Sequence, residues 1–227
     1  MRALPEDGKS FFGYPFWNEV NKLAVAVHFV SVKIFGKENL PSPGKEPFIL
    51  VANHSSRWDG PVVQRLLDRK ANYMVSPNEM VGLQGAAVKS VGAFPASPKY
   101  DLVGHFMRQL KGQEPIVVFP EGNVFYDDFV HPFKKATARI ALLGAQEGLP
   151  VSIVPVGIAY SQSRGPGAAI AIGEPIPVGG YLELFEKNKL SAIEGLTFLI
   201  NDRVRLLNQE MKSVLRQKRK TVLLSGV

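Results

Sequence analysis

The sequence predicts an α/β protein with a mostly parallel central sheet flanked by helices, preceded by an N-terminal amphipathic helical element. Three observations support this fold class. Short apolar runs alternate with helical stretches, the helical stretches begin with residues suited to a helix N-terminus, and the C-terminal region repeats apolar residues at helical spacing. Such alternation is typical of layered proteins in which helices cover a parallel sheet.

The predicted strands are short apolar runs, of the length expected for buried strands. They are Phe48–Ala52, Asn72–Ser76, Ile116–Phe119, Ser152–Ala159 and Ala168–Ile172. Helices are predicted to begin at Asp59, Asn78, Asp101 and Pro132, because Asp and Asn cap helix N-termini and Pro is favoured in the first turn. Pro41 to Pro47 is predicted to form a linker leading into the sheet.

The C-terminal region is predicted to form one long helix with a single apolar face, because its apolar residues recur at spacings of three and four. These residues are Ile193, Leu196, Ile200, Val204, Leu207, Met211 and Leu215. The end of the region is basic, which favours a solvated face over a contact with anionic lipid. The basic residues are Arg203, Arg205, Lys212, Arg216, Lys218, Arg219 and Lys220.

Residues 1–40 are predicted to form a helical, membrane-interfacial element. The apolar segment Leu23–Phe35 is too short to span a bilayer, and it contains His28 and Lys33. Aromatic residues of the kind that anchor proteins at a membrane surface crowd just before it, although an amphipathic helix packed on the core is the alternative. They are Phe11, Phe12, Tyr14, Phe16 and Trp17.

Composition limits the classes of function. Apolar residues make up 45% of the chain and charged residues 21%, as in ordinary globular proteins. The absence of cysteine excludes disulfides, thiolate metal sites and a cysteine nucleophile. A formal net charge of +7 favours an anionic partner, such as nucleic acid, anionic lipid or a phosphorylated cofactor. Glu6 and Asp7, in a segment without an apolar core, argue against a secretory signal.

The first candidate site is the pair His54 and Asp59, directly after the predicted strand Phe48–Ala52. An imidazole whose ring N–H is held by a carboxylate can act as a general base near neutral pH. The spacing alone is a weak signal. Asp59 precedes Gly60 and Pro61, so it is also interpreted as a helix cap, a role compatible with orienting a base.

The second candidate site is the turn Pro120 to Asn123, which follows the predicted strand Ile116–Phe119. Ligands of a mainly parallel sheet bind beyond the carboxyl ends of its strands. His54 and Glu121 each follow such an end, so we expect them to share one edge and one crevice. Gly92 to Ser97 is expected to reach the same rim. The alternative is that the turn only connects a strand to a helix.

With these segments in order, the chain resembles the glycerolipid acyltransferase family, the lysophosphatidic acid acyltransferase superfamily. The resemblance covers about Phe35 to Tyr181 and includes four blocks in the family's order. The blocks are Asn53 to Asp59, Gly92 to Ser97, Phe119 to Gly122 and Ile153 to Val156, with flanking agreement at Gly36 to Pro41 and Ile172 to Ile176. It implies that residues 41–227 form an α/β acyltransferase domain.

The resemblance implies direct transfer of a fatty acyl group from acyl-CoA or acyl carrier protein to a lipid hydroxyl in phospholipid biosynthesis. His54 would take the hydroxyl proton and Asp59 would orient the ring. Glu121, Gly122 and Asn123 would bind the acceptor. Neither a cofactor nor a metal is implied, because the thioester serves as a co-substrate. The expected location is the cytoplasmic face of a membrane.

The chain departs from the family pattern where arginines are expected. Ser97-Pro98-Lys99 replaces one arginine and Asn123-Val124 another. A lysine is a point charge without the planar fork of a guanidinium, so it is only a partial substitute. The available replacements are Arg57, Lys99, Lys134 and Lys135, of which Arg57 and Lys99 are assigned to substrate binding. The expected acceptor is 1-acyl-glycerol-3-phosphate, with another lysolipid or a neutral lipid alcohol as alternatives.

Other classes of protein explain less of the sequence. No G-x-S-x-G elbow supports an esterase, and no phosphate-binding loop is present; Gly165-Pro166-Gly167 is not a dinucleotide motif. A non-catalytic basic module that binds a membrane explains the charge but not the blocks at His54 and Glu121. Nucleic acid is not an expected partner.

Overall fold

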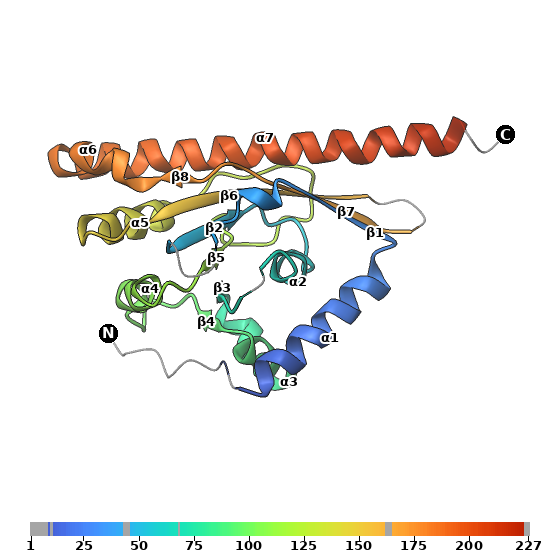
Figure 1. Ribbon diagram of the computed structural model, residues 1–227, viewed down its shortest axis with the longest axis horizontal. Coiled ribbons are helices and arrows are strands. Elements are labelled where there is room, and N and C mark those ends of the chain that lie inside the picture. Colours follow the sequence, from blue (N-terminus) through green and yellow to red (C-terminus); the bar gives the residue numbers. More distant parts are fainter. Residues whose placement is uncertain (1–8, 10, 43–45, 68, 162–164, 225–227) are drawn as a thin grey trace.

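The computed structural model describes residues 9, 11–42, 46–67, 69–161 and 165–224, with only the backbone over 217–224. An eight-stranded sheet lies between two groups of helices, which confirms the predicted fold class (Figure 1). The strands are β1 Ser31–Phe35, β2 Phe48–Ala52, β3 Asn72–Val75, β4 Ala93–Pro95, β5 Ile116–Val118, β6 Ser152–Ser161, β7 Gly167–Ile172 and β8 Ile176–Pro177. The α-helices are α1 Gly13–His28, α2 Asp59–Gln64, α3 Gly82–Ser90, α4 Leu102–Lys111, α5 Ala136–Gln146, α6 Leu182–Lys187 and α7 Lys189–Leu224.

The sheet is mostly parallel, in the order β1-β7-β6-β2-β5-β3-β4. Strands β6, β2, β5, β3 and β4 run in one direction, while β7 and β8 are antiparallel to β6 and β1 is parallel to β7. The two central neighbours β2 and β5 therefore end at the same edge. All five predicted strands are present within two residues at either end.

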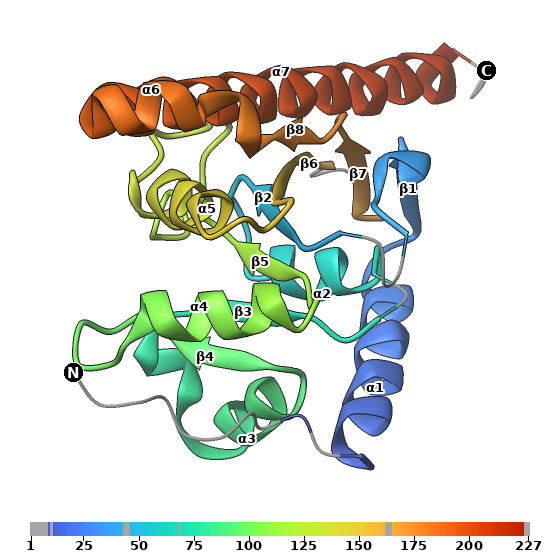
Figure 2. The same cartoon turned by 60° about the vertical axis from the view of Figure 1, so that its left-hand side comes forward.

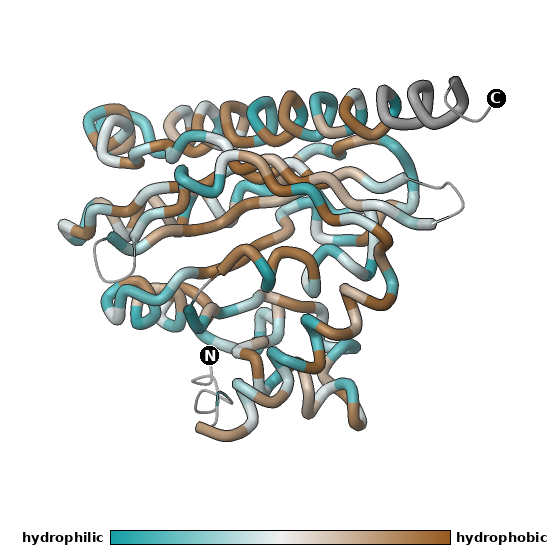
Figure 3. Tube along the Cα trace, turned by 45° about the vertical axis from the view of Figure 1, so that its right-hand side comes forward, coloured by the Kyte–Doolittle hydropathy of each residue, from teal (hydrophilic) through white to brown (hydrophobic). Residues whose placement is uncertain are grey.

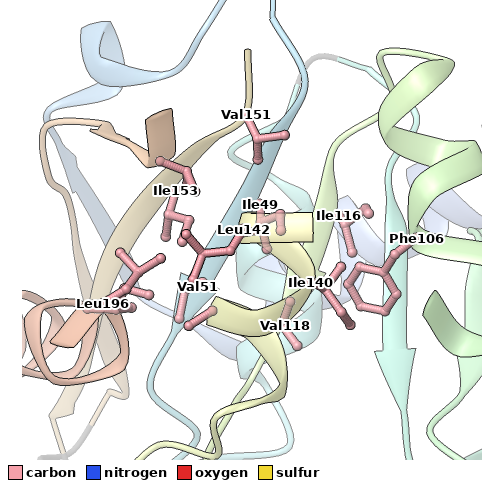
Figure 4. Close-up of a cluster of buried hydrophobic side chains, with 14 of the residues drawn as sticks. Ile49, Val51, Phe106, Ile116, Val118, Ile140, Leu142, Val151, Ile153 and Leu196 are labelled. Atoms are coloured by element: carbon pink, nitrogen blue, oxygen red, sulfur yellow. The ribbon is translucent and has the colours of Figure 1, made fainter. Parts of the chain in front are cut away.

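The core has two layers, one on each face of the sheet. On one face, side chains of β2, β5 and β6 interleave with those of α4, α5 and α7, as Figure 4 shows for Val51, Phe106 and Leu142. On the other face, Phe48 and Leu50 pack with Val25 of α1 and with residues of α2. Because both faces are covered, β2 is entirely apolar and fully buried.

The predicted C-terminal helix is confirmed as α7, which runs along one side of the molecule (Figures 1 and 2). The predicted apolar face packs on the sheet: Leu196, Ile200, Val204 and Met211 are all buried. The side chains of Lys218, Arg219 and Lys220, part of the predicted basic end, lie outside the described residues, as do Glu6 and Asp7.

Two predicted helix starts are wrong. Pro77–Met80 forms a short 3-10 turn, and α3 begins only at Gly82. The φ of Gly82 is 64°, in the left-handed region, so the 3-10 turn does not continue directly into the helix. The helix predicted at Pro132 begins at Ala136. Here the backbone N–H of Lys134 bonds to Pro120, so the chain pairs with the preceding turn before it can become helical.

Part of the predicted N-terminal helical element is also wrong. Helix α1 ends at His28, and Ser31–Phe35 forms strand β1, which pairs with β7. The β-branched residues Val30, Val32 and Ile34 favour an extended chain, and the exposed edge of β7 provides its partner. Asp101 caps α4 as predicted, accepting a hydrogen bond from Gly104 N. No helix within the described residues is both long enough and apolar enough to span a bilayer.

Candidate active site

The loop after β2 carries the first candidate residues and is tied to the neighbouring strand β6. Asn53 is buried, and its side chain makes two hydrogen bonds with the backbone of Ile158, one to the oxygen at 3.1 Å and one from the N–H at 2.8 Å. Asn208 of α7 donates to the same Ile158 oxygen. The position of the next residue, His54, is therefore set by the sheet and by α7.

His54 and Asp59 form the predicted pair. Nδ1 of His54 lies 2.8 Å from Oδ2 of Asp59, and the imidazole stacks on Phe119 with ring centroids 4.4 Å apart. The histidine side chain is 21% exposed, whereas the aspartate side chain is fully buried. When Nδ1 donates to the carboxylate, Nε2 is left free to accept a proton. This is the geometry of an oriented general base.

Asp59 does not cap helix α2, so that interpretation is wrong. It is the first residue of the helix, and its carboxylate points back toward the preceding loop. Oδ2 accepts hydrogen bonds from the backbone N–H groups of Ser55 and Ser56, both at 2.8 Å, as well as from His54. These three hydrogen bonds hold the loop from residue 54 to residue 59 around the carboxylate.

Tyr160 is a site residue that sequence reasoning missed. Its hydroxyl donates a hydrogen bond of 2.7 Å to Oδ1 of Asp59, from a position 101 residues further along the chain. Only the pairing of β6 with β2 brings the two together. The sequence offered one weak signal, which is that Tyr160 follows the fourth block on the same predicted strand region.

Glu121 lies next to the histidine, as expected from the shared sheet edge. Oε1 accepts a hydrogen bond of 2.7 Å from the backbone N–H of His54, and Oε2 accepts one of 3.1 Å from the backbone N–H of His131. The residue is only 4% exposed. Its carboxylate therefore joins the first block to the loop before α5.

Burial raises the pKa of Glu121 above its ordinary value of 4.5. The backbone N–H groups of His54 and His131 act in the opposite direction, since they stabilise the ionised form. A further hydrogen bond joins the loop after β5 to the loop after β2: the backbone N–H of Phe125 donates to the carbonyl of His54 at 2.9 Å. The turn at Glu121 thus holds the backbone of His54 in place and is more than a connection between a strand and a helix.

Gly122 and Asn123 are both exposed at the end of β5. Gly122 adopts a positive φ of 80°, and a side chain there would clash with the ammonium of Lys134. Lys134 is exposed, and within the described part of the chain its ammonium has no hydrogen-bond or ion-pair partner. Lys135, in contrast, pairs with Glu194 at 2.6 Å.

The other two predicted substrate-binding residues are also exposed. Arg57 lies in the loop between His54 and Asp59, and its Nε donates a hydrogen bond of 3.2 Å to the hydroxyl of Tyr126. Lys99 follows β4, whose carboxyl end lies at the same sheet edge because β4 is parallel to β3. It is separated from the histidine loop by strands β3 and β5.

A cavity of about 460 Å³ lies beside the histidine loop. Its lining includes Asn53, Ser55 and Ser56 of that loop and Tyr160 of β6, whereas His54 and Glu121 are not part of it. Within the described residues, no group of three or more histidine, aspartate and glutamate side chains is placed to hold a metal ion.

A histidine held by a buried carboxylate at the carboxyl edge of a parallel sheet has the arrangement expected of an enzyme that uses a general base. The chain belongs to the Acyltransferase family, whose model matches residues 31–159, from β1 to β6. The predicted family and the prediction of an acyltransferase are thus confirmed. No curated protein sequence is significantly similar to the chain.

The fold is similar to that of a solved acyltransferase. The structure is the 1-acyl-sn-glycerophosphate (LPA) acyltransferase PlsC from Thermotoga maritima, with a TM-score of 0.69 and 22% sequence identity. The match covers 88% of this chain and 79% of the PlsC chain. At this identity the similarity supports the fold, including the sheet edge that carries His54.

Proposed function

We propose that the enzyme transfers a fatty acyl group from an acyl thioester to the hydroxyl of a lysophospholipid in phospholipid biosynthesis. The observation that carries this proposal is the 2.8 Å contact between His54 Nδ1 and Asp59 Oδ2 beside the buried Glu121. Acyl-CoA and acyl carrier protein are both donors consistent with direct transfer. The fold similarity to PlsC supports 1-acyl-glycerol-3-phosphate as the first acceptor to test.

In the proposed reaction, Nε2 of His54 takes the proton of the acceptor hydroxyl while its oxygen attacks the thioester carbonyl carbon. The carbon–sulfur bond of the tetrahedral intermediate then breaks, and the leaving sulfur takes the proton from the imidazolium. The products are an ester and a free thiol. Asp59 holds the ring in the required tautomer and stabilises the imidazolium during the attack. No cofactor enters these steps.

We assign Glu121 to positioning His54, because both of its carboxylate oxygens already accept hydrogen bonds from backbone N–H groups. The acceptor then meets Gly122 and Asn123, which are exposed. Lys134, whose ammonium lies close to Gly122 and has no partner among the described residues, is the best-placed cation for an acceptor phosphate. Arg57 and Lys99 are proposed for more distant anionic groups of the acceptor or donor.

We propose that α1 docks on the cytoplasmic surface of a membrane, in the interfacial plane. Its inner side makes polar contacts with the protein: Asn18 accepts from Gln64 and Asn21 donates to the carbonyl of Pro61. Helix α1 lies at the periphery of the fold, and its trace in Figure 3 alternates between hydrophobic brown and hydrophilic teal. On its outer side, together with the N-cap residue Phe12, exposed apolar residues recur at spacings of three and four and therefore share one face. They are Phe12, Phe16, Val20, Leu23 and Val27, which are between 38% and 81% exposed.

Two further exposed apolar residues extend this surface. Val81 and Leu83, at the start of α3, are 72% and 78% exposed, and α3 contacts α1. A row of exposed apolar residues on a helix whose opposite side holds the polar contacts is unusual for a water-facing surface. It fits an interfacial helix.

The test of the proposed reaction is thiol release from palmitoyl-CoA with a panel of lysolipids. We expect release that requires an acceptor and disappears in His54→Ala, while circular dichroism of the variant is unchanged. Acceptor-independent release would indicate a thioesterase instead. Normal turnover by His54→Ala would remove the catalytic assignment. A panel containing 1-acyl-glycerol-3-phosphate, lysophosphatidylcholine and a monoacylglycerol distinguishes the acceptor classes.

A further inference from the structure

Asp59 is held between two side-chain partners, one on each carboxylate oxygen. His54 contacts Oδ2 at 2.8 Å, while the hydroxyl of Tyr160 donates to Oδ1 at 2.7 Å. Asp59 is fully buried, and the only other donors to it among the described residues are the backbone N–H groups of the loop, both on Oδ2. Tyr160 is therefore the sole described donor to the second oxygen.

We propose that Tyr160 is a positioning residue for the catalytic pair, acting through Asp59 to hold the imidazole and to moderate the attraction of the carboxylate for the histidine proton. This inference rests on the proposed function, because it concerns the same general base. A hydrogen bond donated to a carboxylate stabilises its negative charge and weakens its attraction for other protons. Removal of the tyrosine is therefore expected to strengthen the hold of the carboxylate on the histidine proton.

The tyrosine ring is itself fixed by aromatic packing. It stacks on Phe29 at the end of α1, with centroids 5.6 Å apart and planes 19° apart. Phe29 in turn packs against Trp58, the residue before Asp59, at 5.5 Å. Movement of the hydroxyl away from the carboxylate would therefore disturb the packing of Tyr160 on the buried ring of Phe29.

The hydroxyl also remains a donor throughout the pH range in which an imidazole base works. Burial, followed by the negative charge of Asp59 and their hydrogen bond, raises the pKa of Tyr160 well above its usual range. A phenol that stays protonated can donate only one hydrogen bond, and the structure directs it to Oδ1.

Other ionisable groups surround the pair without bonding to the tyrosine hydroxyl. Glu121, from the β5 loop, binds the backbone of His54. His28, from α1, stacks on Trp58, and Asp127 of the loop before α5 and Lys212 of α7 line the cavity that Tyr160 also lines. These groups are unchanged in the variants below, so a difference between the variants reports the hydroxyl.

The test compares Tyr160→Phe with Tyr73→Phe. Tyr73 is a matched control because it is another tyrosine of the sheet, it is buried, and within the described residues its hydroxyl has no hydrogen-bond partner. The ring protons of His54, assigned with His54→Gln, are titrated by NMR without substrate. We expect the titration midpoint to rise by about 0.5 to 1 pH unit in Tyr160→Phe, as for partial loss of a charge-assisted hydrogen bond, and to stay in place in Tyr73→Phe.

Kinetics give a second measurement. The acid limb of the pH–rate profile should move up with the midpoint, and kcat at neutral pH should fall about tenfold while both KM values stay within about twofold. A merely structural tyrosine would lower the fraction of active enzyme without moving the acid limb. Should Tyr160→Phe fold poorly, 3-fluorotyrosine at position 160 keeps the ring and is a stronger donor, so the midpoint should move down.

Equal midpoints in wild-type protein, Tyr160→Phe and the fluorotyrosine protein would overturn the role of Tyr160. So would a rise of the same size in Tyr73→Phe. Because the titration needs no substrate, failure of the proposed function is distinguishable: it would appear as wild-type protein that transfers no acyl group although the midpoints move as expected.

Discussion

The backbone N–H of His54 donates a hydrogen bond of 2.7 Å to the carboxylate of Glu121, a residue 67 positions further along the chain. The other oxygen of Glu121 holds the backbone of His131. The two sequence blocks that suggested the function are thus joined directly, one clamping the other. Changes at Glu121 are therefore expected to act through the histidine.

Glu121→Gln should lower kcat about 10- to 100-fold with little change in KM. Glutamine has one acceptor oxygen in place of two, so one of the two buried backbone N–H groups would lose its partner and the histidine loop would shift. Steady-state kinetics with saturating donor measure the effect. Glu174→Gln removes an exposed carboxylate and serves as the control. Equal kcat in wild-type protein and Glu121→Gln would contradict the clamp.

The stability contributed by Glu121 should fall as the pH rises. Burial raises the folded-state pKa of this group above its ordinary value of 4.5, so the folded protein binds more protons than the unfolded chain between these two values. The difference in the free energy of unfolding between the wild type and Glu121→Gln should be largest below pH 4.5. It should decrease as the pH rises above 4.5. Urea unfolding at several pH values measures this, and a difference that increases with pH would oppose the assignment.

Asp59→Asn should reduce kcat by about 10³- to 10⁴-fold, the size of effect seen when an aspartate that orients a catalytic histidine is neutralised. The amide also places an NH₂ group where four hydrogen-bond donors now converge. Acceptor-dependent thiol release is measured as for His54→Ala, with thermal unfolding as the check on folding. A folded Asp59→Asn protein with more than about a tenth of wild-type activity would be inconsistent with the pair.

Lys134→Ala should raise KM for a phosphate-bearing acceptor about tenfold and leave a neutral monoacylglycerol unaffected, because a hydrogen bond to a charged group contributes about 1.5–3 kcal/mol. Lys135→Ala is the neighbouring control, since Lys135 pairs with Glu194. KM for each acceptor, measured in both variants at a fixed donor concentration, distinguishes the effect of Lys134 from that of Lys135. Equal KM changes in both variants would assign the effect to general surface charge instead.

The double variant Phe16→Glu and Leu23→Glu should bind anionic vesicles at least about tenfold more weakly, since each large apolar side chain contributes roughly 1.5–3 kcal/mol on burial. Point changes are preferable to deleting residues 1–35, which would also remove β1 from the sheet. Phe198→Glu changes a residue that is 75% exposed on α7 and should have no effect. Vesicle flotation decides, and undiminished flotation of the double variant would exclude docking through α1.

The central elements were predictable because their signals are local. A fully apolar run such as β2 has few alternatives to a buried strand, and the long periodic face of α7 defines a helix without reference to the rest of the chain. The short strands β1 and β4 were not predicted. Both depend on pairing with a neighbour: β1 pairs with β7, and β4 pairs with β3.

The loop between Asn123 and Lys135 was not predictable, because its structure depends on contacts outside the segment. Its helix was predicted too early because Pro132 suits a first helical turn. In the structure, the backbone N–H of His131 bonds to Glu121 and that of Lys134 bonds to Pro120, so both groups are used before α5 begins. These partners lie outside the segment, and local preference cannot reveal them.

The sequence by itself determined the fold class, the family and the residue types of the candidate site, because apolar periodicity and motif order are properties of the linear chain. Tertiary structure alone decided that Glu121 clamps the backbone of His54 and that Tyr160 completes the environment of Asp59. These contacts join residues 67 and 101 positions apart. They exist because parallel strands bring their carboxyl ends to one edge of the sheet, and the spacing of residues along the chain does not record which strands will be neighbours.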